Sequence, residues 1–176
     1  MINLLNLGTV SSGFGQRTSP TAGASSNHKG IDIVLKDDMI PSVLGGTVSY
    51  VGYSKTGGNM ISIEQSDGTT ATYMHLSTLP QLKVGELVEP GTPIGSQGST
   101  GISTGKHLHF QVEKNGEYID PEKYFSEYGK ISIPVINSGG NILSNIATKV
   151  IQILAVILIL VLAAYLFMKA FDISII

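Results

Sequence analysis

The chain has 176 residues, a formal net charge of −2 and no cysteine. The absence of cysteine excludes a disulfide framework, cysteine-ligated zinc and thiol catalysis. Because basic side chains do not gather on any stretch, the sequence also predicts no nucleic-acid partner.

Residues 1–128 are rich in glycine and β-branched residues, and turn signals separate their short apolar runs, which predicts one β domain with a modest core. Alternation of apolar and polar residues predicts strands over 30–34, 46–52, 60–65, 69–74, 93–98, 107–113 and 117–119. No stretch before residue 141 shows helical periodicity. The predicted fold class is therefore all-β, an antiparallel β-sandwich or a barrel-like domain.

A polar, glycine-containing linker is predicted over 129–145, followed by an apolar segment. Residues 150–168 carry no charge and lie between Lys149 and Lys169. As a helix this run would be roughly 28 Å long, close to the hydrocarbon thickness of a bilayer. A buried core helix is the alternative, but so small a domain has no second layer to cover it. The sequence predicts a single C-terminal transmembrane helix over 146–170 and, at the N-terminus, no secretory signal.

The chain has only four histidines, and the first of them, His28, lies close in the sequence to a carboxylate. His28 and Asp32 are four residues apart where a loop enters a predicted strand, and Gly30 between them allows close approach of the backbone. His75 ends another predicted strand, a common place for a catalytic group held by a rigid scaffold. Taken alone, a histidine at a strand end is more often a surface or hydrogen-bonded residue than a catalyst.

The other two histidines, His107 and His109, are two residues apart on a predicted strand, so both side chains point to one face. Leu108 and Phe110 then take the opposite face, which suits a buried core. Imidazole and carboxylate are the usual ligands of a catalytic zinc, which takes three protein groups and leaves a position for water. Since these segments use every histidine of the chain, their combination predicts a metal site.

Further motifs accompany the histidines between residues 10 and 125. They are Ser12-Gly13-Phe14-Gly15-Gln16-Arg17 with Pro20, His28-Lys29-Gly30-Ile31-Asp32, Gly45-Gly46-Thr47-Val48, Gly57-Gly58-Asn59, Tyr73-Met74-His75-Leu76-Ser77, Val84-Gly85-Glu86 with Pro90-Gly91, Gly95, Ser99-Thr100-Gly101, His107-Leu108-His109-Phe110 and Asp120-Pro121. In these residues and their order the chain resembles the lysostaphin and LytM-type zinc endopeptidases, which cut peptide bonds in bacterial peptidoglycan.

The resemblance implies one zinc ion per chain, held by His28, Asp32 and His109, with His75 and His107 as the catalytic pair. His107 would take the proton of the attacking water and pass it to the leaving amine. His75 would orient the water or donate to the oxyanion.

One feature of the family is missing from the sequence. Some members place a tyrosine shortly before the first ligand, where it helps to stabilise the intermediate. Residues 21–27 contain none. That role therefore stays unassigned.

Two other readings explain less of the sequence. The segment 83–95 also resembles biotinyl- and lipoyl-type modules, but no lysine occupies the expected hairpin, and the histidines would have no role. A catalytically silent member that binds peptidoglycan or activates another hydrolase is the second alternative. Such members usually lose ligands, whereas this chain keeps all five positions.

The predicted partners are a peptidoglycan peptide and, through the C-terminal helix, a lipid bilayer. A substrate outside the cytoplasmic membrane and no predicted export signal favour a bacteriophage whose particle contains a membrane. The domain would then reach the wall during infection, beside other virion membrane or capsid proteins. A bacterial envelope protein is the alternative, and the lysines that flank the helix do not decide its orientation.

Overall fold

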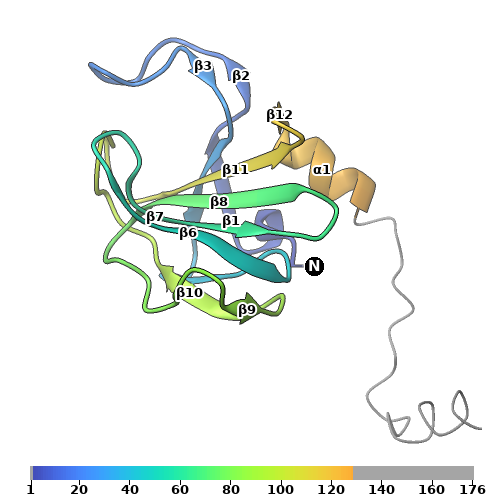
Figure 1. Ribbon diagram of the computed structural model, residues 1–176. Coiled ribbons are helices and arrows are strands. Elements are labelled where there is room, and N and C mark those ends of the chain that lie inside the picture. The colour runs from blue at the N-terminus through green and yellow to red at the C-terminus, as the bar shows by residue number, and fades with distance from the viewer. Residues whose placement is uncertain (1, 129–176) are drawn as a thin grey trace, which may run out of the picture. The chain divides into compact units, whose positions relative to one another are not determined.

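Alternating side chains on the central strands build the core of this protein, whose computed structural model describes residues 2–128 (Figure 1). In β8 (Thr69–Leu76), Ala71 and Tyr73 are buried, while Thr70 and Thr72 between them are half-buried. This period of two residues is that of a strand with one face on the core. The ring of Tyr73 packs against that of Phe110 with centroids 5.1 Å apart, so the neighbouring strand shares the core.

The main sheet has eight strands, and every pair in it is antiparallel. Its strands follow one another in the order β1 (Gly8–Ser12), β4 (Ile31–Leu35), β11 (Leu108–Lys114), β8, β7 (Gly58–Glu64), β6 (Gly46–Ser54) and β9 (Leu87–Val88), and β12 (Glu117–Ile119) pairs with β11. Two small sheets join β10 (Pro93–Ser96) to β5 (Met39–Pro41) and β2 (Gly15–Gln16) to β3 (Asn27–His28). A short 3-10 helix, η1 (Leu4–Asn6), places Leu4 in the core.

The predicted antiparallel β class is confirmed. Its predicted form differs, because among the described residues the strand order runs open from β1 to β9 rather than closing into a barrel. The two small sheets lie outside the main sheet, and β2 and β3 belong to an arm that extends from it (Figure 1). Each predicted strand is present: the one over 117–119 matches β12 at both ends, and the others are shifted at one end or both. The short strands β1, β2, β3, β5 and β9 were not predicted, because they are too short or too polar to alternate clearly.

The expectation of no helix before residue 141 was wrong. The helix α1 (Pro121–Tyr128) follows β12, and Asp120 caps it by accepting a hydrogen bond from the Glu122 amide at 3.0 Å. Proline suits the first helical position. Phe125 stacks on Phe110 with centroids 5.7 Å apart, so the helix covers the core beside β11. Eight residues are too few to show a helical period, and the Asp-Pro pair was the available signal.

The predicted linker over 129–145 and the predicted transmembrane helix over 146–170 lie outside the described residues. The predicted boundary between the β domain and the linker, at residue 128, therefore stays a prediction. Within residues 2–128, no helix has the length and apolar character needed to cross a membrane.

Gly30 lies where β4 approaches β11, and replacing it by alanine is expected to lower the free energy of unfolding by roughly 1–3 kcal/mol. A Cβ there would collide with the carbonyl oxygen of Phe110 and lie 2.9 Å from Cγ of Gln111. Urea unfolding followed by circular dichroism measures the change. Gly105→Ala is the matched control, because nothing lies within 4 Å of a Cβ at that position. Equal stability of both variants would contradict the close approach.

Candidate metal centre

The register of two neighbouring strands brings two of the predicted metal ligands together. Asp32 on β4 lies directly opposite His109 on β11, so their side chains project from the same face of the sheet. His28 ends β3, four residues before Asp32. All three residues are buried, with 2% of His28, 9% of Asp32 and 8% of His109 exposed. Their burial fits an interior site rather than a surface cluster.

One atom of each of these residues points to a common centre. Oδ1 of Asp32 lies 2.7 Å from Nδ1 of His109 and 3.1 Å from Nε2 of His28. The two nitrogens lie 3.0 Å from each other. Together the three atoms form a group of potential metal ligands, the one that the sequence predicted.

The hydrogen bonds of His28 show that this group fits a cation. Nδ1 of His28 lies 2.6 Å from the carbonyl oxygen of Gly13, and because a carbonyl can only accept, Nδ1 carries the proton. In the neutral ring Nε2 then presents a lone pair to Oδ1 of Asp32. Two acceptors facing each other at 3.1 Å repel unless a positive charge lies between them. A metal ion bound by both atoms removes this repulsion, and two imidazoles with one carboxylate are ligands that zinc accepts.

The charge of Asp32 is also set by its neighbours. Burial alone would raise the pKa of this carboxyl, but the close polar contacts with His109, His28 and Arg17 hold the pKa well below its usual range. Burial lowers the pKa of His109, against the opposing effect of Asp32. The site therefore presents a carboxylate and, at His109, a neutral imidazole, which are the protonation states that bind a metal.

His75, at the end of β8, is held in one orientation by Thr100. Its Nδ1 donates a hydrogen bond of 2.8 Å to the carbonyl oxygen of Thr100, which leaves the lone pair of Nε2 free. Burial lowers the pKa of His75 to about 4, so the ring is neutral near pH 7. Its backbone has φ 61°, an uncommon value for a residue other than glycine, and such strain gathers at functional sites.

His107 lies just before β11, paired with Gly98 through an isolated bridge, although a strand position was predicted for it. Its Nδ1 lies 2.8 Å from the carbonyl oxygen of Gly105 and therefore donates, which again leaves Nε2 unprotonated in the neutral ring. Nε2 of His107 lies 3.6 Å from Oδ1 of Asp32. The rings of His75 and His107 have centroids 4.9 Å apart. The rings of all four histidines thus lie at one site.

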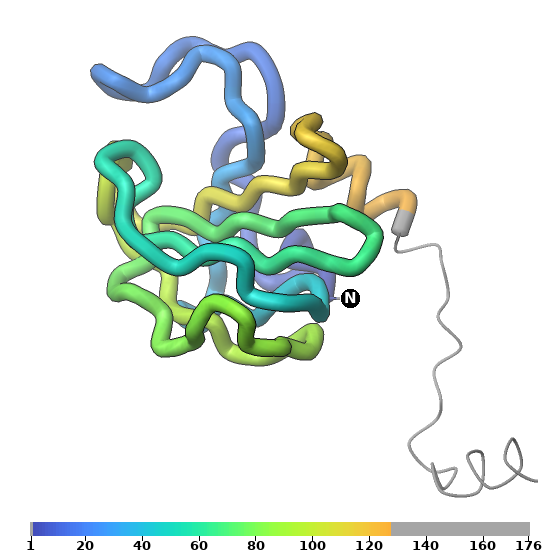
Figure 2. Tube along the Cα trace, viewed as in Figure 1, coloured from blue at the N-terminus to red at the C-terminus, as the bar shows by residue number. Residues whose placement is uncertain are grey.

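Three loops surround these histidines. The arm between β2 and β3 extends at the same end of the sheet as the turn between β6 and β7 (Figure 2). The loop before β11 joins this turn where the Ile102 amide donates to the carbonyl oxygen of Thr56 at 2.9 Å. An open cleft of about 360 Å³ lies beside the arm and is lined by His28, Lys29, Met74, His75, Ile102 and Gln111. The cleft opens onto the candidate metal centre, since His28 and His109 are among the residues that line it.

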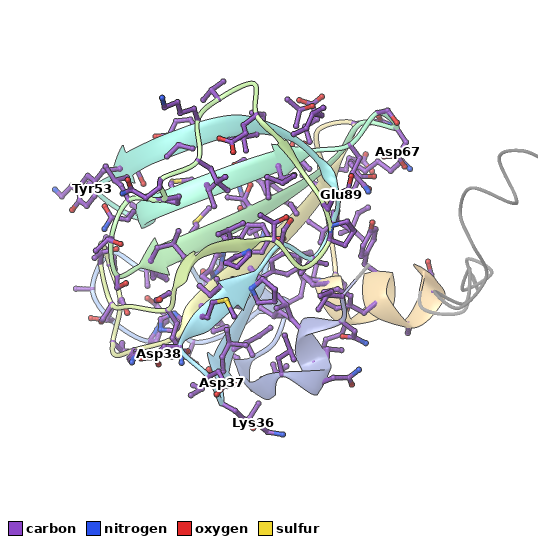
Figure 3. All side chains as sticks on the ribbon, turned by 90° about the horizontal axis from the view of Figure 1, so that it is seen from below. Lys36, Asp37, Asp38, Tyr53, Asp67 and Glu89 are labelled. Carbon is purple, nitrogen blue, oxygen red and sulfur yellow. The ribbon has the colours of Figure 1, made fainter. Side chains whose placement is uncertain are left out.

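A smaller cavity of about 40 Å³ lies directly on the site, lined by Asp32, His75, His107 and His109 among others. It is polar and large enough for one water molecule. The β4–β5 turn carries Asp38, which is labelled in Figure 3. Nζ of Lys106 lies 2.6 Å from Oδ2 of Asp38, so the loop that carries His107 contacts this turn. Both partners of this ion pair are exposed, so it adds little stability.

One site residue was missed in the sequence. Arg17 donates from Nη1 to Oδ2 of Asp32 at 2.8 Å, on the carboxylate oxygen that does not face the histidines. The motif Ser12-Gly13-Phe14-Gly15-Gln16-Arg17 contains this residue. No role follows from the motif alone, since the pairing with Asp32 depends on how β1 folds onto β4.

The fold and site together define a metallohydrolase-type centre, with three converging metal ligands beside two histidines that can accept protons. Residues 26–121 match the sequence profile of peptidase family M23, and the chain belongs to this family. The resemblance to lysostaphin and LytM-type peptidases is thereby confirmed at the level of the family.

Individual relatives agree with this assignment. Lysostaphin of Staphylococcus simulans is 36% identical over 108 residues, which cover 60% of this chain and 22% of lysostaphin. The DD-carboxypeptidase/endopeptidase Mpg of Neisseria meningitidis serogroup B is 34% identical over 113 residues, which cover 64% of this chain and 26% of Mpg. The chain therefore spans about a quarter of the length of these curated relatives.

Solved structures show the same fold. The crystallised catalytic domain of lysostaphin matches with a TM-score of 0.61 and 33% identity, covering 70% of this chain and 95% of that domain. A zinc-containing peptidase from Vibrio cholerae matches with a TM-score of 0.57 and 32% identity, covering 66% of this chain and 36% of that protein.

Thr100 makes hydrogen bonds to three neighbouring residues at the site, Leu76, Asn59 and His75. Thr100→Val is expected to lower the free energy of unfolding by roughly 1–3 kcal/mol. Its hydroxyl donates to the carbonyl oxygen of Leu76 at 2.8 Å and accepts from the Asn59 amide at 3.0 Å. Valine keeps the shape but removes the acceptor of the Asn59 amide and one of the two donors to the Leu76 carbonyl, whose other donor is Nδ2 of Asn59. It also loosens the carbonyl that orients His75. Thr100→Ser keeps the hydroxyl and serves as control. Thermal unfolding measures the effect, and a valine variant as stable as the serine variant would contradict it.

Proposed function

We propose that the chain is a zinc metalloendopeptidase that hydrolyses peptide bonds in the cross-links or stem peptides of bacterial peptidoglycan. The observation that carries this proposal is the convergence of His28, Asp32 and His109 on one point beside the acceptor nitrogens of His75 and His107. The names of the relatives support the reaction and the substrate class, because Mpg is a DD-carboxypeptidase/endopeptidase and ShyC of Vibrio cholerae is a peptidoglycan DD-endopeptidase. The zinc-containing relative of the same fold supports the choice of metal.

Each residue has a role that follows from its contacts. His28, Asp32 and His109 would hold the zinc ion, which would supply Lewis-acid polarisation of the scissile carbonyl and a lowered pKa, roughly 7, for water in the site. Nε2 of His107 accepts the proton of the attacking water, because its Nδ1–H is already donated to Gly105, and later passes that proton to the leaving amine.

His75 acts as an acceptor that orients the water. The sequence left a second role open, donation to the oxyanion. Neutral His75 carries its proton on Nδ1, where it is donated to Thr100, so Nε2 has none to give. The lowered pKa, about 4, favours this neutral form near pH 7. The structure therefore supports the orienting role over the donating one.

Digestion of defined peptidoglycans tests the proposed function. Walls with glycine cross-bridges and walls with directly linked stem peptides are incubated with the purified chain, and the fragments are identified by mass spectrometry. New amino termini at one peptide linkage, abolished by a chelator and restored by zinc, are the expected result. Intact wall in every case, with bound zinc and bound peptidoglycan, would instead support the silent binding module.

We further propose that residues 150–168 anchor the domain to a membrane, either in a bacteriophage particle that contains lipid or in a bacterial envelope. The support is the uncharged run between Lys149 and Lys169. Zymography of purified particles, with and without detergent extraction of their lipid, tests the virion location. A wall-degrading band in the lipid fraction supports it, and confinement of the protein to the envelope of uninfected cells would contradict it.

A further inference from the structure

Residues 12–17, which we term the support segment, run from the end of β1 through β2 (Figure 1) and contact two of the three candidate metal ligands. The carbonyl oxygen of Gly13 accepts the hydrogen bond from Nδ1 of His28 at 2.6 Å. Nη1 of Arg17 donates to Oδ2 of Asp32 at 2.8 Å. One segment therefore contacts both ligands on the side away from the converging atoms.

The register of β1 fixes where Arg17 can reach. Ser12 lies directly opposite Asp32 in the pairing of β1 with β4, after a shift in register. Oγ of Ser12 accepts a second hydrogen bond from Nη1 of Arg17 at 2.5 Å. The guanidinium is thus held by the strand next to Asp32 as well as by Asp32 itself. Its position is set by the fold and not by the ion pair alone.

The choice of residue is informative, since Arg17 is the only arginine in the sequence, while the other basic side chains are lysines. The Arg17 side chain is 20% exposed, and its Nε is buried and has no hydrogen-bond partner among the described residues. Burying most of a guanidinium costs free energy unless its charge is paired. The guanidinium of arginine is planar, stays charged and is less strongly hydrated than the ammonium of lysine. Arginine therefore suits such a site better than lysine does.

The two oxygens of Asp32 are therefore in different environments. Oδ1 faces the nitrogens of His28 and His109, and Oδ2 faces Arg17. A carboxylate with both oxygens free can turn and offer both of them to a cation. With Arg17 on Oδ2, only Oδ1 is offered. A second oxygen from Asp32 would take up a position that water and substrate need.

We propose that Arg17 is a positioning residue of the metal centre, which holds Asp32 so that only Oδ1 serves as a ligand and the open position stays free. This inference rests on the proposed metal site, and it assigns a role to a residue that does not itself bind the metal. Ser12 anchors Arg17 in that role. Groups that orient metal ligands in this way typically affect metal affinity or activity by about 10–100-fold when they are removed.

Cobalt(II) alone, added to the metal-free full chain in detergent, gives a readout that is independent of hydrolysis. Its visible absorption is strong with four ligands and weak with more, so it reports how many atoms surround the ion. In Arg17→Gln we expect weaker absorption than in the wild type, since Oδ2 is released to bind the ion. With zinc, kcat should fall about 10–100-fold while KM changes less than about twofold.

Two further variants keep the test decisive if Arg17→Gln does not fold. Ser12→Ala keeps the charge but removes the anchor of Arg17, and it should weaken the cobalt absorption to a smaller extent. Arg17→Lys keeps a donor for Oδ2 and should recover part of the wild-type absorption. Lys114→Gln removes the ion pair with Asp67 at the opposite end of β11 from His109, so it is the matched control and should change neither measurement.

The outcomes separate this inference from the proposed function. Wild-type absorption and wild-type kcat in Arg17→Gln and Ser12→Ala would overturn the role of Arg17 while leaving the metal site intact. Failure of the wild-type chain to bind cobalt or zinc would overturn both. Weakened absorption with a lowered kcat in Arg17→Gln, partly recovered in Arg17→Lys, supports the assignment.

Discussion

Asp32→Ala is expected to abolish both metal binding and hydrolysis, because it removes the only charged member of the ligand group. Oδ1 of Asp32 is the atom that both His28 and His109 face, at 3.1 and 2.7 Å. Without it, two imidazoles remain, and a buried divalent ion keeps no counter-charge among its ligands. Elemental analysis of the full chain, purified without chelator, should give close to one equivalent of zinc for the wild type and none for the variant.

Asp38→Ala is the matched control for this experiment. Asp38 is an exposed carboxylate that pairs with Lys106 on the outside of the same region, so its loss should leave the zinc content unchanged. His28→Ala should lose the metal as Asp32→Ala does, since it removes a second converging atom. A wild-type chain that is free of metal yet active would contradict the assignment of these ligands.

The sequence predicted the site better than it predicted the path of the chain around it. His28 and Asp32 are near neighbours in the sequence, as are His107 and His109, so their spacing already limits how each pair can point. What joins the two pairs is the register of β4 with β11, which places Asp32 opposite His109. That pairing links residues far apart in the sequence, and no local pattern specifies it.

The hydrogen bonds that fix the histidine rings could not be predicted at all. They end on the backbone carbonyls of Gly13, Thr100 and Gly105. Any residue type has such a carbonyl, so side-chain identity carries no signal of the contact. The same holds for the left-handed backbone of His75, which lies in β8 where its pairing with β7 shifts in register, a feature that the histidine itself does not signal.

His107→Ala and His75→Ala are expected to keep zinc and lose about 10²–10⁴-fold in the rate of hydrolysis, the usual contribution of general acid–base catalysis. Neither residue belongs to the converging ligand group, since Nε2 of His107 lies 3.6 Å from Oδ1 of Asp32 while Nδ1 of His109 lies 2.7 Å from it. Zinc content and the release of fragments from purified wall are measured on the same preparations, so that a loss of activity is separated from a loss of metal.

The left-handed backbone at His75 calls for a second variant at that position. Alanine is strained at φ 61°, whereas asparagine tolerates this conformation, so His75→Asn removes the imidazole with less disturbance of the backbone. Both variants should show the same loss of rate if the imidazole is what matters. Loss of zinc in His107→Ala, with zinc retained in His109→Ala, would show that the ligand and catalytic roles of these two histidines are the reverse of those assigned from the structure.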